Sequence, residues 1–315
     1  MRKRTILVVV LFVIFLIIIS ASIFLIWPQS DTTPHTIIYG KVKDATSDKP
    51  IANAQVTVLG TSGVTVQSST YGDWKLIVKS GGTFKIKITK PGFTEVYRKI
   101  TLNKGSEDTV STAFLTPQEP RSSSVVEFEQ QGSKKVEMVV FSNGGGSIQL
   151  RIPKTVLGQV KVNGVLKDIS KEVQITRLSG SLALPGELSQ TPNLKFPIAF
   201  LFCAEIGPTG AEFIQPVTLR VKNTWGFLPG TEIPVAFWDT KNLEWVGLEK
   251  QAVVDAKGEW IQAAIKHLSS YDINSPQSFG RGIPIVDVGP FPDDYTCDIG
   301  SGVNVSTGSL MNSVS

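Results

Sequence analysis

The chain has 315 residues, with 31 Lys and Arg against 27 Asp and Glu, and is long enough for two or three domains. It contains only two His and two Cys, which restricts metal binding and nucleophilic catalysis. The net charge is +4, but the lysines alternate along predicted strands and do not cluster. We therefore expect solvated strand faces and no nucleic-acid surface.

Residues 1–28 predict a signal anchor that crosses a membrane once. Basic residues at positions 2–4 precede an uncharged apolar run from Ile6 to Trp27 (residues 6–27). At about 1.5 Å per helical residue, this run can span a hydrocarbon core of about 30 Å. The basic flank stays in the cytoplasm, so the remaining chain is expected outside it.

The alternative for the same segment is a cleaved signal peptide that releases a secreted protein. The small residues Ser20, Ala21 and Ser22 would then form the cleavage site. The apolar run continues past this site and is longer than an ordinary signal core, which favours the uncleaved anchor. A polar tether, residues 29–36, leads to the first predicted strand.

Residues 37–115 predict an antiparallel β-sandwich. Apolar and polar side chains alternate in the runs 54–59, 74–78 and 84–89, as expected of strands with one buried and one solvated face. Turn-forming Gly, Pro and Asp residues separate these runs. Short strands at this spacing are typical of a sandwich.

Four motifs in this region carry a family resemblance. They read GKVKD at 40–44, KPIANAQVTV at 49–58, YGDWKL at 71–76 and KPGF at 90–93. Together they resemble the carboxypeptidase regulatory-like family. The resemblance implies a seven-stranded, transthyretin-like sandwich that serves as an accessory domain and has no catalytic role of its own.

Residues 116–124, rich in Pro and Ser, predict a linker to a second β-rich region over 125–274. Within that region, residues 239–242 predict a hairpin turn between two aromatic strands. The sequences GGGSIQLRIPKTVL, VQITRL and IGPTGAEFIQPVTL, which begin at 144, 173 and 206, resemble ZU5-like β-domains. That resemblance implies a contact module and not an enzyme.

Residues 275–315 predict a flexible tail that is rich in Pro, Gly and Ser. Its segment 300–310, GSGVNVSTGSL, resembles the lead-in to the repeat shell of Rhs (YD-repeat) proteins. This resemblance implies the N-terminal stalk of an Rhs-type surface protein. A disordered tail without such a role is the alternative.

The sequence offers no catalytic, cofactor-binding or metal-binding residues. His35 lies in the tether, and His267 ends a predicted strand, where we expect a hydrogen-bonded structural role. Cys203 falls in an apolar run and is expected to be buried and inert. Cys297 lies in the tail; an extracytoplasmic location permits a Cys203–Cys297 disulfide, but their predicted positions do not favour it.

Tryptophans supply the only candidate contact residues. We expect core packing for most of them. Trp238 alternates out of phase with its apolar neighbours and is the strongest candidate for exposure, and Trp225 and Trp260 are further candidates for contact with a ligand or partner.

The sequence thus predicts an all-β protein of tandem antiparallel β-sandwich domains behind one N-terminal transmembrane helix. The preferred function is that of a non-enzymatic, membrane-anchored extracytoplasmic stalk or interaction protein, with a protein or polysaccharide partner at the cell surface. The alternative is a carbohydrate-binding or accessory module of a secreted hydrolase.

Overall fold

The computed structural model describes residues 34–60, 63–186 and 200–274, together with three short strands in the tail. These strands, which pair in one small sheet, are β23 (Asp298–Ile299), β24 (Val303–Asn304) and β25 (Ser309–Leu310). The predicted membrane helix, most of the tether and most of the Rhs-like tail lie outside the described residues. No helix within the described ranges has the length and apolar character needed to span a membrane.

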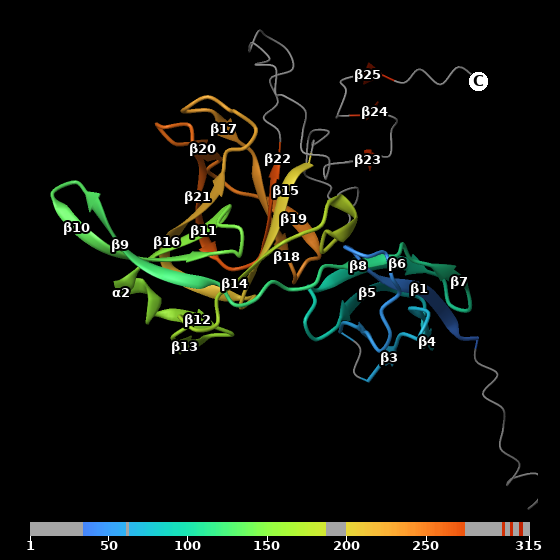
Figure 1. Ribbon diagram of the computed structural model, residues 1–315. Helices are drawn as coiled ribbons and strands as arrows, with labels where there is room; N and C mark the ends of the chain where they lie inside the picture. Colours follow the sequence, from blue (N-terminus) through green and yellow to red (C-terminus); the bar gives the residue numbers. More distant parts are fainter. Residues whose placement is uncertain are drawn as a thin grey trace, which may run out of the picture.

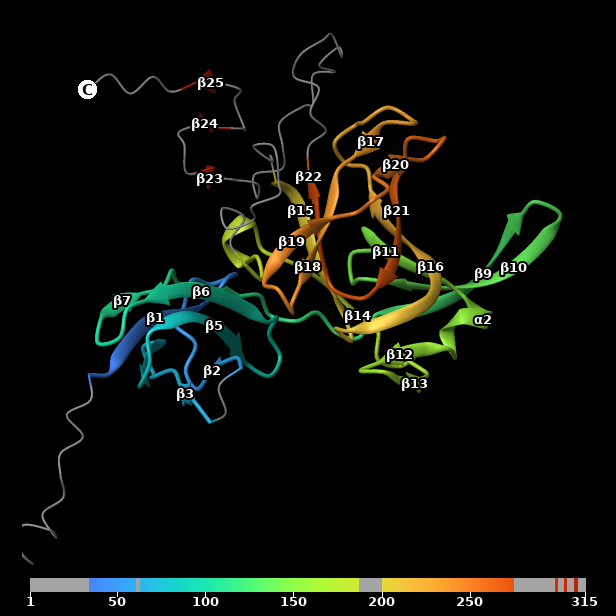
Figure 2. The same ribbon diagram turned by 180° about the vertical axis from the view of Figure 1, so that it is seen from behind.

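The first unit is a sandwich of two four-stranded sheets, drawn from blue to teal in Figures 1 and 2. Its strands are β1 (Thr36–Asp44), β2 (Gln55–Val58), β3 (Thr65–Gln67), β4 (Asp73–Val78), β5 (Gly82–Thr89), β6 (Val96–Leu102), β7 (Glu107–Thr109) and β8 (Ala113–Leu115). One sheet has the order β4-β1-β7, with β8 also paired to β1, and the other has the order β3-β2-β5-β6. All pairs are antiparallel except β1–β7 and β1–β8.

The predicted alternation in this unit is confirmed. In β5 the side chains of Phe84, Ile86 and Ile88 are buried, while the lysines between them are partly exposed. The same alternation holds in β4, where Trp74 is buried. Trp74 lies across the β1–β4 pair from Gly40, which leaves room for the indole ring between the sheets.

The second unit contains a nine-stranded and a five-stranded sheet. Strands of the larger sheet are β9 (Ser123–Gln131), β10 (Lys134–Ser142), β11 (Ile148–Pro153), β12 (Val160–Val162), β13 (Val165–Lys167), β16 (Ala211–Lys222), β17 (Glu232–Ile233), β20 (Ala252–Val254) and β21 (Trp260–His267). Strands of the smaller sheet are β14 (Gln174–Arg177), β15 (Phe200–Gly207), β18 (Val235–Asp239), β19 (Glu244–Gly247) and β22 (Ser270–Asn274). Two short helices, α2 (Lys154–Leu157) and η1 (Ser181–Ala183), complete the unit.

The larger sheet has the order β17-β20-β21-β16-β11-β10-β9, with the β12–β13 hairpin attached to β16. The smaller sheet has the order β14-β15-β22-β18-β19. A continuous core between them includes Phe141 and Leu150 from the larger sheet and Ile206 and Tyr271 from the smaller one. The predicted hairpin turn after Asp239 is confirmed by the β18–β19 pairing.

The predicted linker is hydrogen-bonded to both units. The Gln118 N–H donates to the Gly92 carbonyl of the first unit at 2.8 Å. The Glu119 N–H donates to Thr176 Oγ1 at 3.2 Å, and the Ser122 N–H donates to the Val173 carbonyl at 3.0 Å. The chain between the two units is therefore bonded at several points along its length.

A first test concerns the close approach of Trp74 to Gly40. A Cβ at position 40 would lie 2.2 Å from the Trp74 ring, so Gly40→Ala forces the buried indole to move. Such overpacking destabilises a core by about 1–3 kcal/mol. We expect urea unfolding to show that loss in Gly40→Ala.

Gly247→Ala is the matched control, because Gly247 also lies in a strand but has no atom within 4 Å of an added Cβ. It should unfold like the unsubstituted chain. Equal midpoints for the two variants would refute the packing of Trp74 on Gly40.

Candidate functional site

The two units meet at a hydrophobic cluster that is distinct from their cores, here called the junction cluster. Its buried members are Tyr97, Leu178, Ala183, Leu184, Cys203, Ala236, Trp238, Leu243 and Trp245. The ring centroids of Tyr97 from β6 and Trp238 from β18 are 6.0 Å apart. Trp238 in turn packs edge-on against Trp245 of β19 at 5.4 Å. Aromatic pairs at such separations stabilise a contact beyond the area that they bury.

The segment 178–186 holds these rings in place. The Tyr97 N–H donates to the Pro185 carbonyl, which joins the backbones of the two units directly. The Trp245 indole N–H donates to the Gly186 carbonyl at 3.2 Å. A Cβ on Gly186 would lie 1.9 Å from the Trp238 ring, so the ring requires glycine at that position.

The prediction that Trp238 is exposed was wrong. Its side chain is only 5% exposed, because β18 is covered on both faces. Val235 of β18 packs in the core of the second unit, whereas Trp238 faces the junction cluster. The prediction treated the second face of this strand as solvated, but the segment 178–186 and Tyr97 of the first unit cover it.

The other two candidate tryptophans are half-buried and belong to different surroundings. Trp225 packs against Phe202 and Phe227, with ring centroids 6.4 and 6.3 Å away. Trp260 lies beneath the Arg220 guanidinium, whose central carbon is 5.0 Å from the ring centroid. Both rings thus have intramolecular partners, and neither lines a hollow described below.

A buried carboxyl, Glu205 of β15, lies beside the junction cluster. It accepts hydrogen bonds from the Glu95 N–H at 3.4 Å and from Gln118 Nε2 at 3.5 Å. Burial and, to a smaller extent, the nearby Glu95 carboxylate raise the pKa of Glu205 from its ordinary value of 4.5 to about 7. These hydrogen bonds and Lys87, which pairs with Glu95 at 2.7 Å, oppose that shift.

A second buried carboxyl, Asp272 of β22, lies opposite Cys203 in the same sheet. Asn274 Nδ2 donates to Asp272 Oδ2 at 3.0 Å, whereas Oδ1 has no hydrogen-bond partner among the described residues. Burial raises the pKa of Asp272 to about 7. The prediction that Cys203 is buried is confirmed, and burial raises the pKa of its thiol. Cys297 lies outside the described residues.

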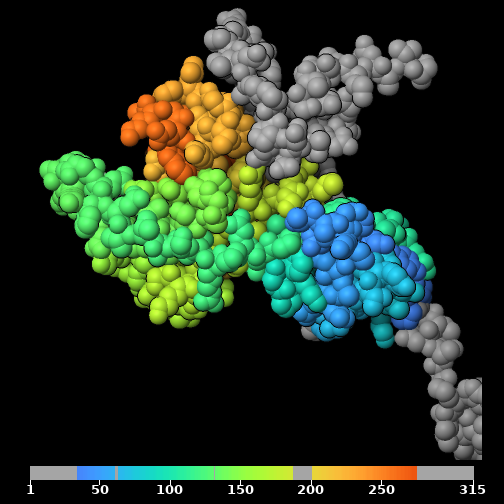
Figure 3. Space-filling model, viewed as in Figure 1, coloured from blue at the N-terminus to red at the C-terminus, as the bar shows by residue number. Residues whose placement is uncertain are grey.

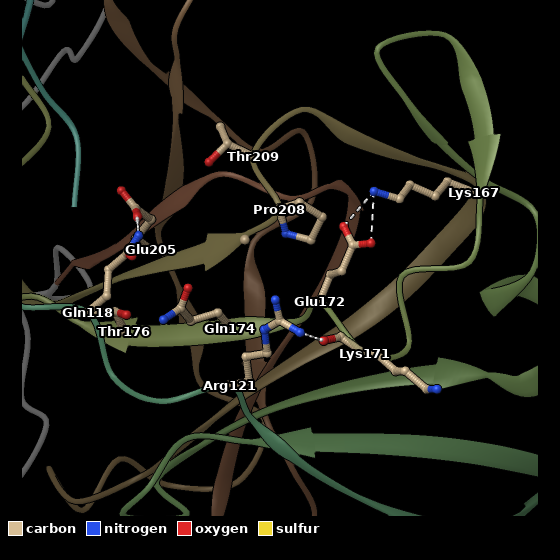
Figure 4. A pocket seen from close by; sticks show the side chains of 11 residues that line it. Gln118, Arg121, Lys167, Lys171, Glu172, Gln174, Thr176, Glu205, Pro208 and Thr209 are labelled. Carbon is tan, nitrogen blue, oxygen red and sulfur yellow. Dashed lines mark hydrogen bonds and ion pairs between the residues drawn. The ribbon is translucent and has the colours of Figure 1, made fainter. Parts of the chain in front are cut away.

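Glu205 also borders a polar hollow of about 490 Å³ (Figure 4). In it Lys167 pairs with Glu172 at 2.8 Å, and the Arg121 guanidinium donates to the Lys171 carbonyl at 2.9 Å. The lining residues are Gln118, Arg121, Lys167, Lys171, Glu172, Gln174, Thr176, Glu205, Gly207, Pro208 and Thr209. This lining offers hydrogen bonds to a polar ligand and contains neither His nor Cys.

A second hollow of about 490 Å³ shares Gln118 with the first. It is bordered by Lys87, Lys90, Phe93 and Glu95 of the first unit. Across residues 34–60, 63–186 and 200–274, no group of three or more His, Cys, Asp or Glu side chains could hold a metal ion.

His267 packs among aromatic side chains, as expected of a structural residue. Its ring is 4.4 Å from the Phe237 ring, and the Tyr271 hydroxyl donates to its carbonyl. Burial lowers the pKa of the imidazole. His35, the other histidine, precedes β1.

Sequence reasoning missed Tyr97, Glu95 and Glu205. A signal for Glu205 did exist, since it is the one charged residue in the apolar sequence FLFCAEIG of β15. A carboxyl within such a run is seldom buried without a specific partner. Tyr97 gave no comparable signal, because its partner Trp238 is remote in sequence.

Comparison with protein families shows that residues 37–115 match the carboxypeptidase regulatory-like domain. The predicted resemblance of this region is therefore confirmed. No family match supports the ZU5-like or Rhs resemblances of the later regions. A comparison with curated protein sequences found no match.

Solved structures with similar segments include a streptococcal ancillary pilin, at 11% identity and a TM-score of 0.25; the match covers 40% of this chain and 55% of that one. A DUF3823 family protein from Parabacteroides merdae has 9% identity and a TM-score of 0.21, with 75% of this chain and 100% of that chain covered. BcpA, the major pilin subunit of Bacillus cereus, has 10% identity and a TM-score of 0.22, with 78% and 96% covered. The family match is to the carboxypeptidase regulatory-like domain, over residues 37–115.

Proposed function

We propose that this chain is a non-enzymatic, membrane-anchored extracytoplasmic module that holds two β-sandwich units in one fixed orientation. The junction cluster is the observation that carries this proposal. Tyr97 of the first unit is buried against Trp238 of the second, and a backbone hydrogen bond from Tyr97 to Pro185 joins them directly. A buried, hydrogen-bonded contact of this kind resists the relative motion that loosely linked domains show.

In this proposal, residues 6–27 anchor the chain in the membrane, and the tail connects the module to the part of the protein that it positions. The apolar run would fix the module to the membrane, and the segment 300–310 would lead into an Rhs-type shell. The module would then act as a spacer that sets the position of whatever follows it. The two hollows that share Gln118 of the linker are available for contact with a surface polymer or protein.

Membrane anchoring is tested by fractionating source cells with an antibody against residues 40–270. We expect the protein in the membrane fraction, resistant to carbonate extraction and released by detergent, because an uncleaved apolar run would span the bilayer. Protease added from outside should digest the β-units. A soluble product in the medium would contradict the anchor and favour signal cleavage.

The same blot tests continuation of the chain. A membrane-bound band far larger than 34.2 kDa is expected if an Rhs-type shell follows. A band near 34.2 kDa would contradict that part of the proposal and leave the anchored module as the whole product.

The fixed orientation is tested with Tyr97→Ala. This change removes the aromatic contact with Trp238 and leaves a cavity. Truncating a fully buried aromatic side chain to alanine costs about 3–5 kcal/mol of stability. We expect trypsin to cleave after Arg121, between the units, about 150- to 5,000-fold faster, since cleavage follows the open population.

Tyr71→Ala is the control, because Tyr71 lies in the same unit and is 73% exposed. It should leave the cleavage rate unchanged. Equal cleavage of Tyr97→Ala and the unsubstituted chain would show that the junction cluster does not hold the units together.

The buried carboxyl at the junction makes stability depend on pH. Because the folded pKa of Glu205 is raised to about 7, the folded state binds more protons than the unfolded state between pH 4.5 and 7. The contribution of Glu205 to the free energy of unfolding is therefore fully present below about pH 4.5 and is lost as pH rises towards 7. Glu205→Gln should remove that loss and stabilise the protein by up to about 3 kcal/mol at pH 8.

Urea unfolding at pH 5 and pH 8 measures this difference. Glu249→Gln is the matched control, since Glu249 is exposed. If Glu205→Gln shifted stability equally at both pH values, Glu205 would not be the titrating group.

A further inference from the structure

Strand β9 is the last strand of the nine-stranded sheet, and its outer edge has no partner strand among those described. The β9–β10 hairpin extends away from the body of the molecule (Figures 1 and 2), and Figure 3 shows it as a protruding green lobe. β10 pairs with β9 from Lys134 to Ser142, but with β11 only from Met138 onward. The outer half of the hairpin is thus a two-stranded ribbon, which is marginally stable in water by itself.

Three large apolar side chains of β9 are exposed to solvent. The exposed fractions are 56% for Val125, 55% for Val126 and 61% for Phe128. Proteins ordinarily shorten, charge or cover such an edge, because its unpaired backbone groups accept another strand. We call the open edge of this strand, with its three exposed side chains, the β9 edge.

The hairpin geometry identifies which backbone groups are free. A two-residue turn, Gly132 and Ser133, joins Gln131 to Lys134, so this closing pair is hydrogen-bonded. Hydrogen-bonded and non-hydrogen-bonded pairs then alternate along the ribbon. The N–H and C=O groups of the even-numbered residues 124, 126 and 128 therefore point to the open edge.

Charge at the edge is balanced within the chain. Arg151 donates to Glu127 at 2.7 Å and to Glu129 at 3.3 Å. Arg151 is itself buried, so both carboxylates are held against a fixed positive charge. The repulsion that would separate two copies of β9 is thereby reduced.

The order of residues in β9 favours one register for self-pairing. In an antiparallel pair centred on Val126, that residue meets its own copy, Ser124 meets Phe128, and Val125 meets Glu127. Registers centred on Glu127 or Phe128 place Glu127 opposite the carboxylate of Glu127 or Glu129 in the second copy. Like charges directly opposite destabilise a strand pair. Registers centred on Ser124 or Val125 avoid such pairs but overlap fewer residues of β9, so the register centred on Val126 is preferred.

We infer that the β9 edge pairs with the β9 edge of a second copy of this chain, antiparallel and centred on Val126. The two nine-stranded sheets then continue through a two-fold axis, as a closed symmetric contact requires. This self-association goes beyond the proposed spacer function and does not depend on it.

The first test is the mass of the full chain in detergent, after subtraction of the bound detergent. The unsubstituted protein should show twice the 34.2 kDa of one chain. Val126→Lys should show one chain mass, because two lysines would meet at the axis. Val253→Lys is the control, since Val253 is an exposed apolar residue of β20 and should leave the dimer intact. A monomeric unsubstituted chain would overturn the inference.

The second test is disulfide cross-linking in a Cys297→Ser background, in which the remaining Cys203 is buried. Across the axis, the Cα atoms of a Val126→Cys pair would be about 5.5 Å apart, within disulfide range. Those of Gln130→Cys would be about 27 Å apart, at about 3.4 Å per residue. Val126→Cys should therefore cross-link at least about tenfold faster. Equal rates, or faster cross-linking of Gln130→Cys, would overturn the register.

Discussion

The packing of Tyr97 on Trp238 determines how the two sandwich units are arranged. It depends on three conditions that must hold together: a wide aromatic side chain on an outward face of each unit, glycine at position 186, and a chain segment whose carbonyls accept hydrogen bonds from the Tyr97 backbone and the Trp245 indole. Each unit has its own hydrophobic core, so neither needs the contact for its sheets to form. The junction cluster therefore determines orientation and not fold.

Beside this contact the molecule buries acidic groups that oppose its stability at neutral pH. Glu205 receives two long hydrogen bonds, and one oxygen of Asp272 has no partner among the described residues. Hydrophobic packing of Trp238 and Trp245 offsets the desolvation of these carboxyls. The hydrogen bonds of Glu205, from the Glu95 backbone and from Gln118, also connect the first unit, the linker and the second unit at one point.

The sequence was sufficient to predict the β-sandwich class and the hairpin after Asp239, because alternation and turn residues are local signals. The sequence was insufficient to predict the junction cluster. Alternation of apolar and polar residues separates the two faces of a strand, but it does not show which part of the protein covers each face. Trp238 was mistaken for an exposed residue for that reason. Glu205 was detectable as a carboxyl in an apolar strand, whereas its neighbours Glu95 and Tyr97 come from the other unit and share no local pattern with it.

The position of β1 in its sheet has a mechanical consequence. The strand begins at Thr36, next to the tether, and lies between β4 on one side and β7 and β8 on the other. Tension applied to the tether acts along β1, so it loads the hydrogen bonds on both sides of the strand in shear. These bonds must break together and cannot open one after another from an end. If the proposed anchor is correct, the pulling force enters through the strand whose hydrogen bonds resist it on both sides.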